Sequence, residues 1–317
     1  MKKILITRKL IKSSEELASK LFEVKLNIND KILTREDIIK ESDGCDGILS
    51  SITDKFDNDI ISKLPRSIKI ISNFAVGFGN IDIDQAKKRN IVVTNTPNVL
   101  TDATAEIAML ILLGAARRAK EGMEWAKKKS WKWSADFLMG KQLTGNRLGI
   151  LGMGRIGRAV ADRARSFGMK IHYHNRTRLN KNLERDAIYH NTLESLLSVS
   201  DFFSINCPAT KETKKIINKK NINYFPDGAV VSNSARGDMI DDDAMVEALK
   251  KGKIFGLGLD VYNGEPDIHS EYLTLPNVYV LPHLGSSTKK TRTAMADLAI
   301  TNIDEFFKNG KCKNTVN

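Results

Sequence analysis

Three polar residues with complementary chemistry follow the ends of three apolar, strand-like segments in the second half of the chain. Arg236 comes two residues after AVVSNS, Glu265 five residues after IFGLGLD, and His283 two residues after VYVL. Ligands of an open α/β sheet bind beyond the carboxyl ends of its strands. We therefore expect the three side chains to meet at one edge of one sheet.

Together these side chains suit the reduction of a 2-keto acid. The guanidinium of Arg236 can bind carboxylate and keto oxygens and stabilise negative charge on the carbonyl. A histidine has an unperturbed pKa of about 6.5, so His283 can donate a proton to that oxygen near neutral pH. Glu265 can hold the other ring nitrogen and favour the charged ring. The three residues form the predicted catalytic set.

Each of the three also has a purely structural interpretation. Arg236 can cap the helix predicted over DDDAMVEALKK, and Glu265 can lie in an exposed turn before Pro266. For His283 the alternative is a structural histidine in a satisfied environment. Their common position at one sheet edge favours the catalytic interpretation. No cysteine, histidine or carboxylate spacing indicates a metal site.

A glycine-rich turn lies upstream, in LGILGMGRIGRAVADRARSFGMKIHYHNRTR, residues 148–178. An apolar strand leads into Gly152, Gly154 and Gly157, and a helix and a second strand follow. These glycines permit a tight turn, close approach of backbone amides to a pyrophosphate, and close packing of helix on strand. The helix N-terminus then favours the anion. The pattern predicts a dinucleotide site.

The end of the second strand indicates which dinucleotide. An NAD site usually has an Asp or Glu there, which accepts from the ribose 2′-OH. This chain has Asn175, followed by Arg176, Thr177 and Arg178. The two guanidinium groups can bind a 2′-phosphate through charge-assisted hydrogen bonds. NADPH is therefore the expected cofactor and NADH a possible one, the alternative being a solvated basic loop.

The first half of the chain offers a second anion site. The segment NFAVGFGN, residues 73–80, follows the apolar strand IKIIS. Backbone amides at Val76 and Gly77 can bind a substrate carboxylate, since glycine allows close approach. An ordinary strand-to-helix turn is the alternative.

Two sets of strand-like segments surround these motifs. Apolar runs separated by polar helical stretches predict parallel sheets with helices on both faces. The first set is 3–7, 24–28, 47–51, 68–74 and 91–95, and the second is 148–151, 170–174, 202–207, 229–234, 254–260 and 278–281. We expect an α/β protein with two doubly wound domains, a flavodoxin-like substrate domain and a Rossmann nucleotide-binding domain.

Two long helical patterns join the predicted domains. One begins at Thr101 as its cap and runs through the arginines and lysines near 117–132, and the other follows Ser287 and ends at Gly310. If the second helix returns to the first domain, that domain is discontinuous. We expect residues 1–99 and 287–317 to form the substrate domain, and 100–286 the dinucleotide-binding domain. Residues Trp125, Trp131 and Trp133 indicate core or a subunit interface, with substrate contact as the alternative.

Composition limits the class of protein. The formal net charge is +12, but lysine and arginine are dispersed, for example over 117–132 and a helix expected at 211–220. No aromatic-interleaved basic patch indicates nucleic acid. The three cysteines lack metal spacing, which is typical of a reduced, cytoplasmic protein. The longest apolar run, 107–116, is too short to span a membrane.

These motifs resemble the D-isomer-specific 2-hydroxyacid dehydrogenases, and within them the glyoxylate/hydroxypyruvate reductases, also called D-glycerate dehydrogenases. The resemblance covers nearly the whole chain, through AVGFGNID, NTPNVLTDATAE, LGILGMGRIGRAV, NCPATKET, NSARGDMIDD, GLGLDVYNGEP and LPHLGSST. It implies the same catalytic set, and it places Val76 and Gly77 near the substrate carboxylate together with Arg236 and His283. A homodimer, formed through the nucleotide domain and its Trp-bearing arm, is also implied.

The resemblance further implies a set of residues along the cofactor. They are Gly152, Gly154, Arg155, Ile156, Gly157, Asn175, Arg176, Thr177, Cys207, Pro208, Thr213, Ser234, Ala235, Asp260, His283 and Gly285. The implied activity is reduction of glyoxylate and hydroxypyruvate to glycolate and D-glycerate. The alternatives are an enzyme of the same family for a bulkier keto acid or phosphohydroxypyruvate, and a nucleotide-sensing interaction protein without activity.

Overall fold

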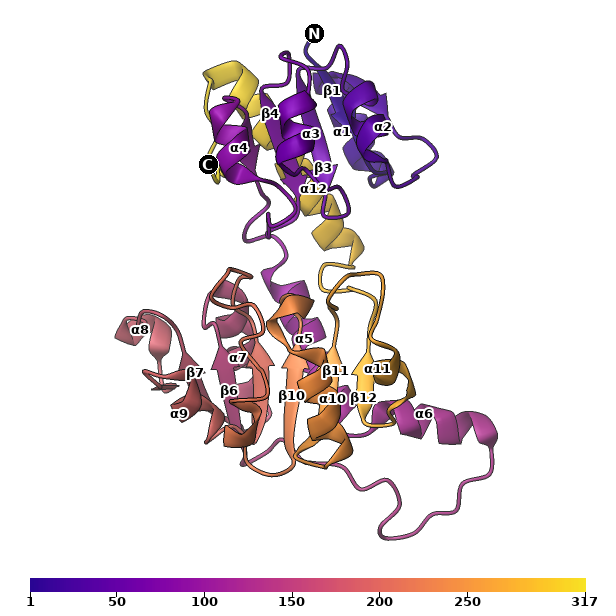
Figure 1. The fold of residues 1–317 in the computed structure, drawn as a ribbon, viewed down its shortest axis with the longest axis vertical. Coiled ribbons are helices and arrows are strands. Elements are labelled where there is room, and N and C mark those ends of the chain that lie inside the picture. The colour runs from indigo at the N-terminus through magenta and orange to yellow at the C-terminus, as the bar shows by residue number, and fades with distance from the viewer. The chain divides into compact units, whose positions relative to one another are not determined.

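The computed structural model describes all residues, 1–317, and divides the chain into two compact units (Figure 1). Unit 1 comprises Met1–Leu100 and Ser287–Asn317, and unit 2 comprises Thr101–Ser286. Each unit has its own sheet and its own hydrophobic core on both faces of that sheet. None of the helices combines the length and the apolar character that crossing a bilayer requires.

Unit 1 contains a five-stranded parallel sheet in the order β2-β1-β3-β4-β5. This order is that of flavodoxin-like folds. The strands are β1 Lys3–Ile6, β2 Glu23–Leu26, β3 Gly47–Ser51, β4 Ile70–Phe74 and β5 Val92–Thr94. The apolar runs of the inner strands β3 and β4 are buried on both faces, which explains why they do not alternate, whereas the edge strand β2 is only partly buried.

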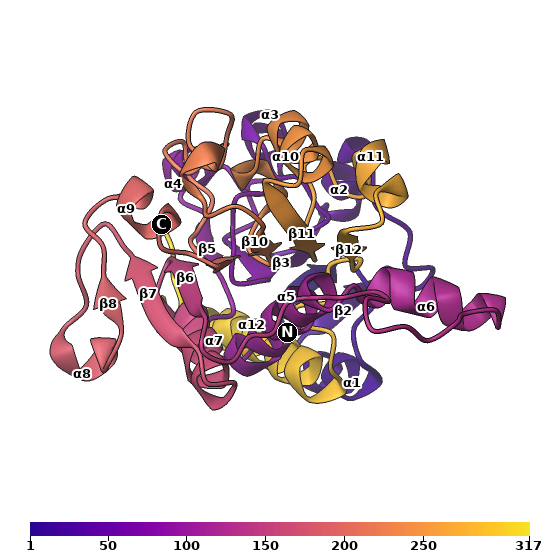
Figure 2. The ribbon, with the colours of Figure 1, turned by 90° about the horizontal axis from the view of Figure 1, so that it is seen from below.

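Helices cover both faces of this sheet (Figure 2). They are α1 Lys12–Leu21 and α12 Lys289–Asn309 on one face, and α2 Arg35–Glu41, α3 Asn58–Lys63 and α4 Ile83–Lys88 on the other. The side chain of Thr288 caps the start of α12 by accepting from the amide of Thr291, and Gly310 ends it in a left-handed conformation. Residues from the end of the chain thus complete the core of the first unit.

Unit 2 contains a seven-stranded parallel sheet in the order β12-β11-β10-β9-β6-β7-β8. The strands are β6 Arg147–Leu151, β7 Lys170–His174, β8 Ile188–Tyr189, β9 Phe202–Ile205, β10 Ala229–Asn233, β11 Ile254–Leu259 and β12 Val278–Val280. The order reverses at β6, as in a Rossmann sheet. The predicted fold class is confirmed, although β8 is a strand that the sequence pattern missed because it is only two residues long.

Helices also cover both faces of the second sheet (Figure 2). They are α5 Thr101–Ala116 and α7 Arg155–Ser166 on one face, and α9 Leu193–Leu197, α10 Asp242–Lys250 and α11 Ser270–Thr274 on the other, with α6 Ala119–Lys128 and α8 Lys181–Glu184 at the periphery. Glycine lets α5 approach β11 closely: a Cβ at Gly258 would lie 2.2 Å from the carbonyl oxygen of Ile111.

Two helical predictions are wrong in part. The long helix expected after Thr101 is interrupted at Arg118, which has a φ of 54° and pairs through its guanidinium with Glu121 on α6. Residues 211–220 form turns and an isolated bridge between Ile217 and Ile240 rather than a helix. Their local hydrogen bonds explain this, since the hydroxyl of Thr213 donates to the carbonyl of Pro208 and its oxygen accepts from the amide of Thr210.

Candidate active site

Unit 2 brings the predicted catalytic side chains together at the carboxyl edge of its sheet. His283 Nδ1 lies 2.7 Å from Glu265 Oε2, and Glu265 Oε1 accepts from the amide of Tyr262 at 2.9 Å. Both side chains are about one-third exposed. With Nδ1 occupied by the carboxylate, His283 keeps Nε2 for a substrate.

The electrostatics of Glu265 suit a partner for an imidazolium. Burial alone would favour the neutral acid, but the hydrogen bond and charge of His283, with smaller contributions from the Tyr262 amide and Arg236, hold the pKa of Glu265 below its ordinary value. Glu265 is therefore a carboxylate at neutral pH. It can orient the ring of His283 and stabilise its charged form.

Arg236 lies near this pair. Burial lowers the pKa of its guanidinium, and the negative charge of Glu265 partly offsets that effect. A glycine makes the approach possible, since a Cβ at Gly237 would lie 1.8 Å from the carbonyl carbon of Tyr262. The alternative role of Arg236 as a helix cap is excluded, because Asp241 caps α10 by accepting from the amide of Ala244.

The backbone of His283 is in a rare conformation that its neighbours hold. Its φ is 56°, a left-handed value that costs a non-glycine residue free energy. The buried carboxylate of Asp260 accepts from the next two amides, Leu284 at 2.6 Å and Gly285 at 2.8 Å. Burial raises the pKa of Asp260 to about 6, and those amides and the charge of His283 oppose the shift. Asp260 thus supports the loop that carries His283.

The glycine-rich turn connects β6 to α7 and leaves an anion site open. A Cβ at Gly152 would lie 2.5 Å from the nitrogen of Cys207, and one at Gly157 would lie 2.2 Å from the carbonyl oxygen of Gly152. A Cβ at Gly154, by contrast, would contact nothing within 4 Å. No side chain caps α7, so the N–H groups of its first turn have no partner. The protein itself demands glycine at 152 and 157, whereas the open space at 154 fits a ligand.

The remaining predicted cofactor residues follow strand ends at the same edge, because all strands of the sheet are parallel. Cys207, Pro208 and Thr213 follow β9, Ser234 and Ala235 follow β10, Asp260 follows β11, and His283 and Gly285 follow β12. Two buried polar atoms here, Asn206 Oδ1 and Ser234 Oγ, have no protein partner. Burial raises the pKa of Cys207 to about 11, so its thiol is neutral. These residues fit a bound dinucleotide.

The loop after β7 distinguishes between its two arginines. Asn175 Oδ1 accepts from the amide of Met153 at 2.7 Å and ties the loop to the glycine turn. Arg178 donates through Nε and a terminal nitrogen to the buried carboxylate of Glu184 and lies over the ring of Tyr189. Arg176 and Thr177 are exposed, and Arg176 makes no ion pair or side-chain hydrogen bond. Arg176 is therefore the arginine of this loop that has no protein partner, whereas Arg178 is already engaged by Glu184.

Unit 1 places Val76 and Gly77 in the loop after β4. The carbonyl of Val76 accepts from Asn95 Nδ2 and that of Gly77 from Asn73 Nδ2. The amides of Val76 and Gly77 donate to no protein group. The loop therefore presents two free N–H donors, as a carboxylate site requires.

Sequence reasoning missed several residues that build these sites. Asn233, at the end of β10, donates to the carbonyl of Arg236 at 2.7 Å and accepts from the amide of Ala235. The hydroxyl of Tyr262 donates to the carbonyl of Leu281 at 2.6 Å. An asparagine directly at a strand end is the signal that could have indicated the first, because its side chain can hold the following turn.

Comparisons with known proteins agree with this geometry. The model of the D-isomer specific 2-hydroxyacid dehydrogenase NAD binding domain matches residues 109–285. Glycerate dehydrogenase of Hyphomicrobium methylovorum is 42% identical over 96% of both chains. Glyoxylate reductase of Thermococcus litoralis is 40% identical over 99% of this chain and 96% of its own.

Solved structures give the same result. A glyoxylate reductase from Paecilomyes thermophila superposes with a TM-score of 0.90 at 35% identity, covering 99% of this chain and 98% of its own. An NADPH-dependent glyoxylate/hydroxypyruvate reductase from Sinorhizobium meliloti, in complex with NADP and malonate, gives 0.89 at 32% identity, covering 99% and 96%. The predicted family is confirmed. This chain belongs to the D-isomer-specific 2-hydroxyacid dehydrogenases and is a nicotinamide-dependent oxidoreductase.

Proposed function

We propose that this enzyme reduces glyoxylate and hydroxypyruvate to glycolate and D-glycerate, with NADPH as its preferred cofactor. The observation that carries the proposal is the hydrogen-bonded His283–Glu265 pair with Arg236 nearby. The glyoxylate reductases and the glycerate dehydrogenase among the relatives support this substrate class.

Each residue then has a defined role. A nicotinamide dinucleotide held by the glycine-rich turn and the strand ends of unit 2 would supply the hydride for the keto carbon. His283 Nε2 donates the proton to the keto oxygen, and Glu265 orients the ring and stabilises its charge. Arg236 binds the substrate and offsets negative charge that develops on the oxygen. The amides of Val76 and Gly77 bind the substrate carboxylate.

Preference for NADPH rests on the loop after β7. No carboxylate stands where an NAD site accepts from the ribose 2′-OH, since Asn175 occupies that position and its side chain is bonded to the Met153 amide. Arg176 is exposed and unpaired and supplies the positive charge for a 2′-phosphate. The ion pair with Glu184 gives Arg178 a structural role in shaping this loop.

Initial-rate kinetics test the proposal directly. Glyoxylate, hydroxypyruvate, pyruvate, phenylpyruvate and phosphohydroxypyruvate are compared with NADPH and with NADH. We expect the highest kcat/KM for the first two substrates with NADPH. A higher kcat/KM for a bulkier or phosphorylated substrate would reassign the substrate, and a higher value with NADH would reject the cofactor preference.

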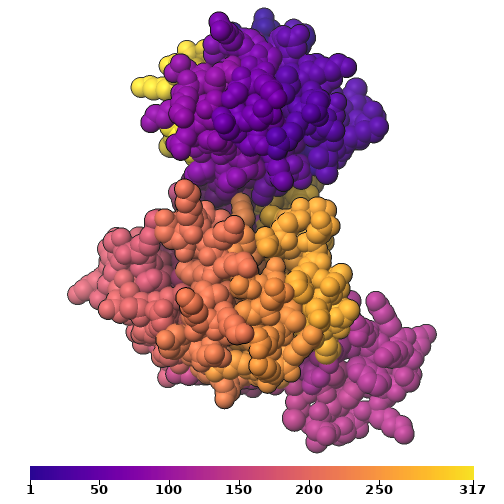
Figure 3. All heavy atoms as spheres, viewed as in Figure 1, coloured from indigo at the N-terminus to yellow at the C-terminus, as the bar shows by residue number.

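We also propose a homodimer in the cytoplasm. Met123, Trp131, Trp133 and Met139 are all more than half exposed on the arm that contains α6, which stands out from the rest of unit 2 (Figure 3). Trp125 instead packs edge-on against Phe137. Exposed large apolar side chains are typical of protein interfaces. Light scattering after size-exclusion chromatography tests whether the protein is a dimer. The proposed cytoplasmic location is supported by the three cysteines, which are all free, as is typical of a reducing compartment.

A further inference from the structure

The amides of Val76 and Gly77 are oriented by the carbonyl groups that precede them. In a trans peptide, the C=O and the following N–H point in opposite directions. The carbonyl of Ala75 accepts from the amide of Thr96 at 2.9 Å, which turns the N–H of Val76 away from Thr96. The carbonyl of Val76 accepts from Asn95 Nδ2 at 2.8 Å. The side chain of Asn95 therefore sets the direction of the Gly77 N–H.

Asn95 is itself held in place on both sides. It is nearly buried, with 9% of its surface exposed. The backbone N–H of Asn95 donates to the backbone carbonyl of Asn314 at 3.2 Å. The backbone carbonyl of Asn95 accepts from Asn302 Nδ2 on α12 at 3.0 Å. The carboxamide thus projects from a backbone that two other segments of unit 1 hold.

The next peptide of the loop is held by a second asparagine. Asn73 Nδ2 donates to the carbonyl of Gly77 at 3.0 Å, and Asn73 Oδ1 accepts from Ser50 Oγ at 3.1 Å. Asn80 pairs with Asn73 and donates to the carbonyl of Asp54 at 3.0 Å. Three consecutive peptides of the loop are therefore bonded to neighbouring elements before any ligand binds.

We propose that Asn95 is a positioning residue for the reaction, which turns the N–H of Gly77 toward the substrate carboxylate. The inference rests on the proposed function, in which the Val76 and Gly77 amides bind that carboxylate. Asn95 donates to a carbonyl on the far side of the same peptide and acts through it. Preorganised donors are worth more than donors that must be reoriented during binding.

Two substitutions separate this role from a general loss of structure. Asn95→Ala removes the donor, and Asn95→Asp keeps the shape but places a carboxylate against the Val76 carbonyl. The carboxylate of the substrate is bound equally in the ground state and in the transition state. Loss of a contact to that carboxylate therefore raises KM more than it lowers kcat. We expect the KM for glyoxylate to rise about tenfold or more in Asn95→Ala, with kcat within about threefold of the wild type. The increase should be larger in Asn95→Asp.

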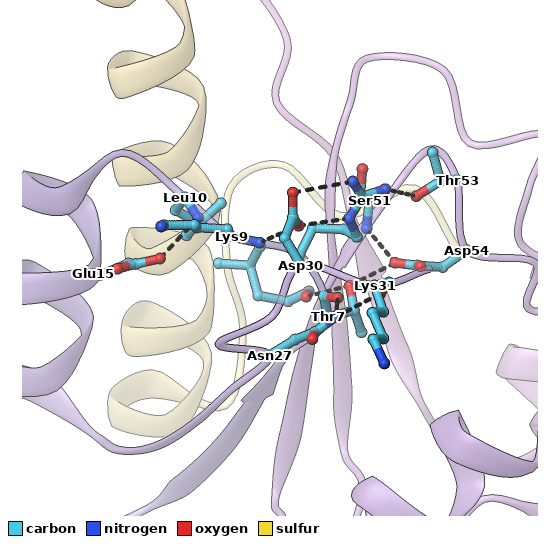
Figure 4. A network of polar contacts seen from close by, with 12 residues as sticks. Thr7, Lys9, Leu10, Glu15, Asn27, Asp30, Lys31, Ser51, Thr53 and Asp54 are labelled. Carbon is cyan, nitrogen blue, oxygen red and sulfur yellow. Dashed lines mark hydrogen bonds and ion pairs between the residues drawn. The ribbon is translucent and has the colours of Figure 1, made fainter. Parts of the chain in front are cut away.

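Unit 1 offers a matched control in Asn27, which follows β2 (Figure 4). Asn27 Nδ2 donates to the backbone carbonyls of Thr7 and Lys31 at 2.8 and 2.7 Å. It therefore also bridges backbone segments, but it makes no hydrogen bond to the loop after β4 that contains Val76 and Gly77. Asn27→Ala should lose a similar amount of thermal stability and leave the KM for glyoxylate unchanged. The NADPH dissociation constant should be unchanged in all three variants.

The outcomes are distinct. An unchanged KM in Asn95→Ala and Asn95→Asp would overturn the inference, as would an equal rise of KM in Asn27→Ala. If Asn95→Ala does not fold, the isosteric Asn95→Asp decides. A wild-type enzyme that reduces none of the keto acids would reject the proposed function itself, and the inference with it.

Discussion

The carboxyl edges of the two sheets use different chemistry. At the edge of unit 2, three side chains that carry or can carry charge, Arg236, Glu265 and His283, lie close together. At the edge of unit 1, the groups free to bind a ligand are the neutral backbone amides of Val76 and Gly77. Titratable groups can move protons, whereas fixed neutral donors can only bind. Under the proposed function, proton transfer therefore belongs to the side chains of unit 2, whereas the amides of unit 1 contribute only to substrate binding.

Both edges nevertheless use the same structural device. Asn73 is the last residue but one of β4 and donates to the carbonyl of Gly77, and Asn233 is the last residue of β10 and donates to the carbonyl of Arg236. Both side chains are fully buried. A carboxamide can donate and accept at once without introducing a charge, which suits a loop that must be rigid but uncharged.

Replacement of His283 by Ala should have the largest effect on activity. Loss of a positioned general acid lowers kcat by about 10²- to 10⁴-fold. Cofactor affinity should be retained, as measured by quenching or enhancement of NADPH fluorescence. His269→Ala is the control, because His269 lies in the same unit and its ring lies against Asp243 and Tyr272, away from the His283–Glu265 pair. Full activity of the His283→Ala variant would contradict the proposal that a side chain of unit 2 donates the proton.

Acid should destabilise unit 2 through His172. Burial, followed by the charge of His190, lowers the pKa of His172 to about 4, and its Nδ1 lies 2.9 Å from His190 Nε2. Between pH 4 and 6.5 the unfolded chain binds more protons, so the free energy of unfolding rises with pH there and falls by about 3 kcal/mol as pH drops from 6.5 to 4.

Urea unfolding followed by hydrogen exchange, read from peptides of unit 2, measures this dependence. His172→Gln removes the titrating group and should flatten the pH dependence in that window. His269→Gln, the control, should not. An identical slope in His172→Gln would show that other groups are responsible for the acid sensitivity.

Replacement of Glu265 by Gln should lower kcat by about ten- to a hundredfold, because the imidazolium loses its anionic partner. The pH profile of kcat for reduction should also change. As the pH is raised, the variant should lose activity at a lower pH than the wild type, because its imidazolium loses the proton more easily. The KM for glyoxylate should change much less. A lower kcat with an unshifted profile would make Glu265 a purely structural contact of His283.

Within unit 2, the two arginines of the loop after β7 should differ. Arg176→Ala should raise the KM for NADPH about tenfold, the value of one charge-assisted contact, and leave the KM for NADH unchanged. Arg178→Ala should affect both cofactors equally and more weakly, since its partner is Glu184. Steady-state kinetics with NADPH and with NADH measure these effects. If only Arg178→Ala raised the KM for NADPH selectively, Arg178 rather than Arg176 would be the residue that binds the 2′-phosphate.

Much of the fold could be predicted from the sequence, for local reasons. Strands buried on both faces read as continuous apolar runs, and helix ends carry local signals such as Thr288 and Gly310. The short strand β8 and the break at Arg118 escaped prediction, because neither has an apolar run or a glycine to mark it. A two-residue strand is stabilised by its neighbour β7 rather than by its own sequence.

The sequence by itself determined the types and order of the groups that do chemistry: a histidine, a glutamate and an arginine after three strand ends, and a glycine turn before a helix. Only the tertiary structure decided which charges are compensated and which donors are free. Arg178 is paired with Glu184 while Arg176 is unpaired, and Asn95 holds the peptide of Gly77 from another strand end. Such pairings depend on distances of a few ångströms between loops, which packing sets and spacing along the chain does not.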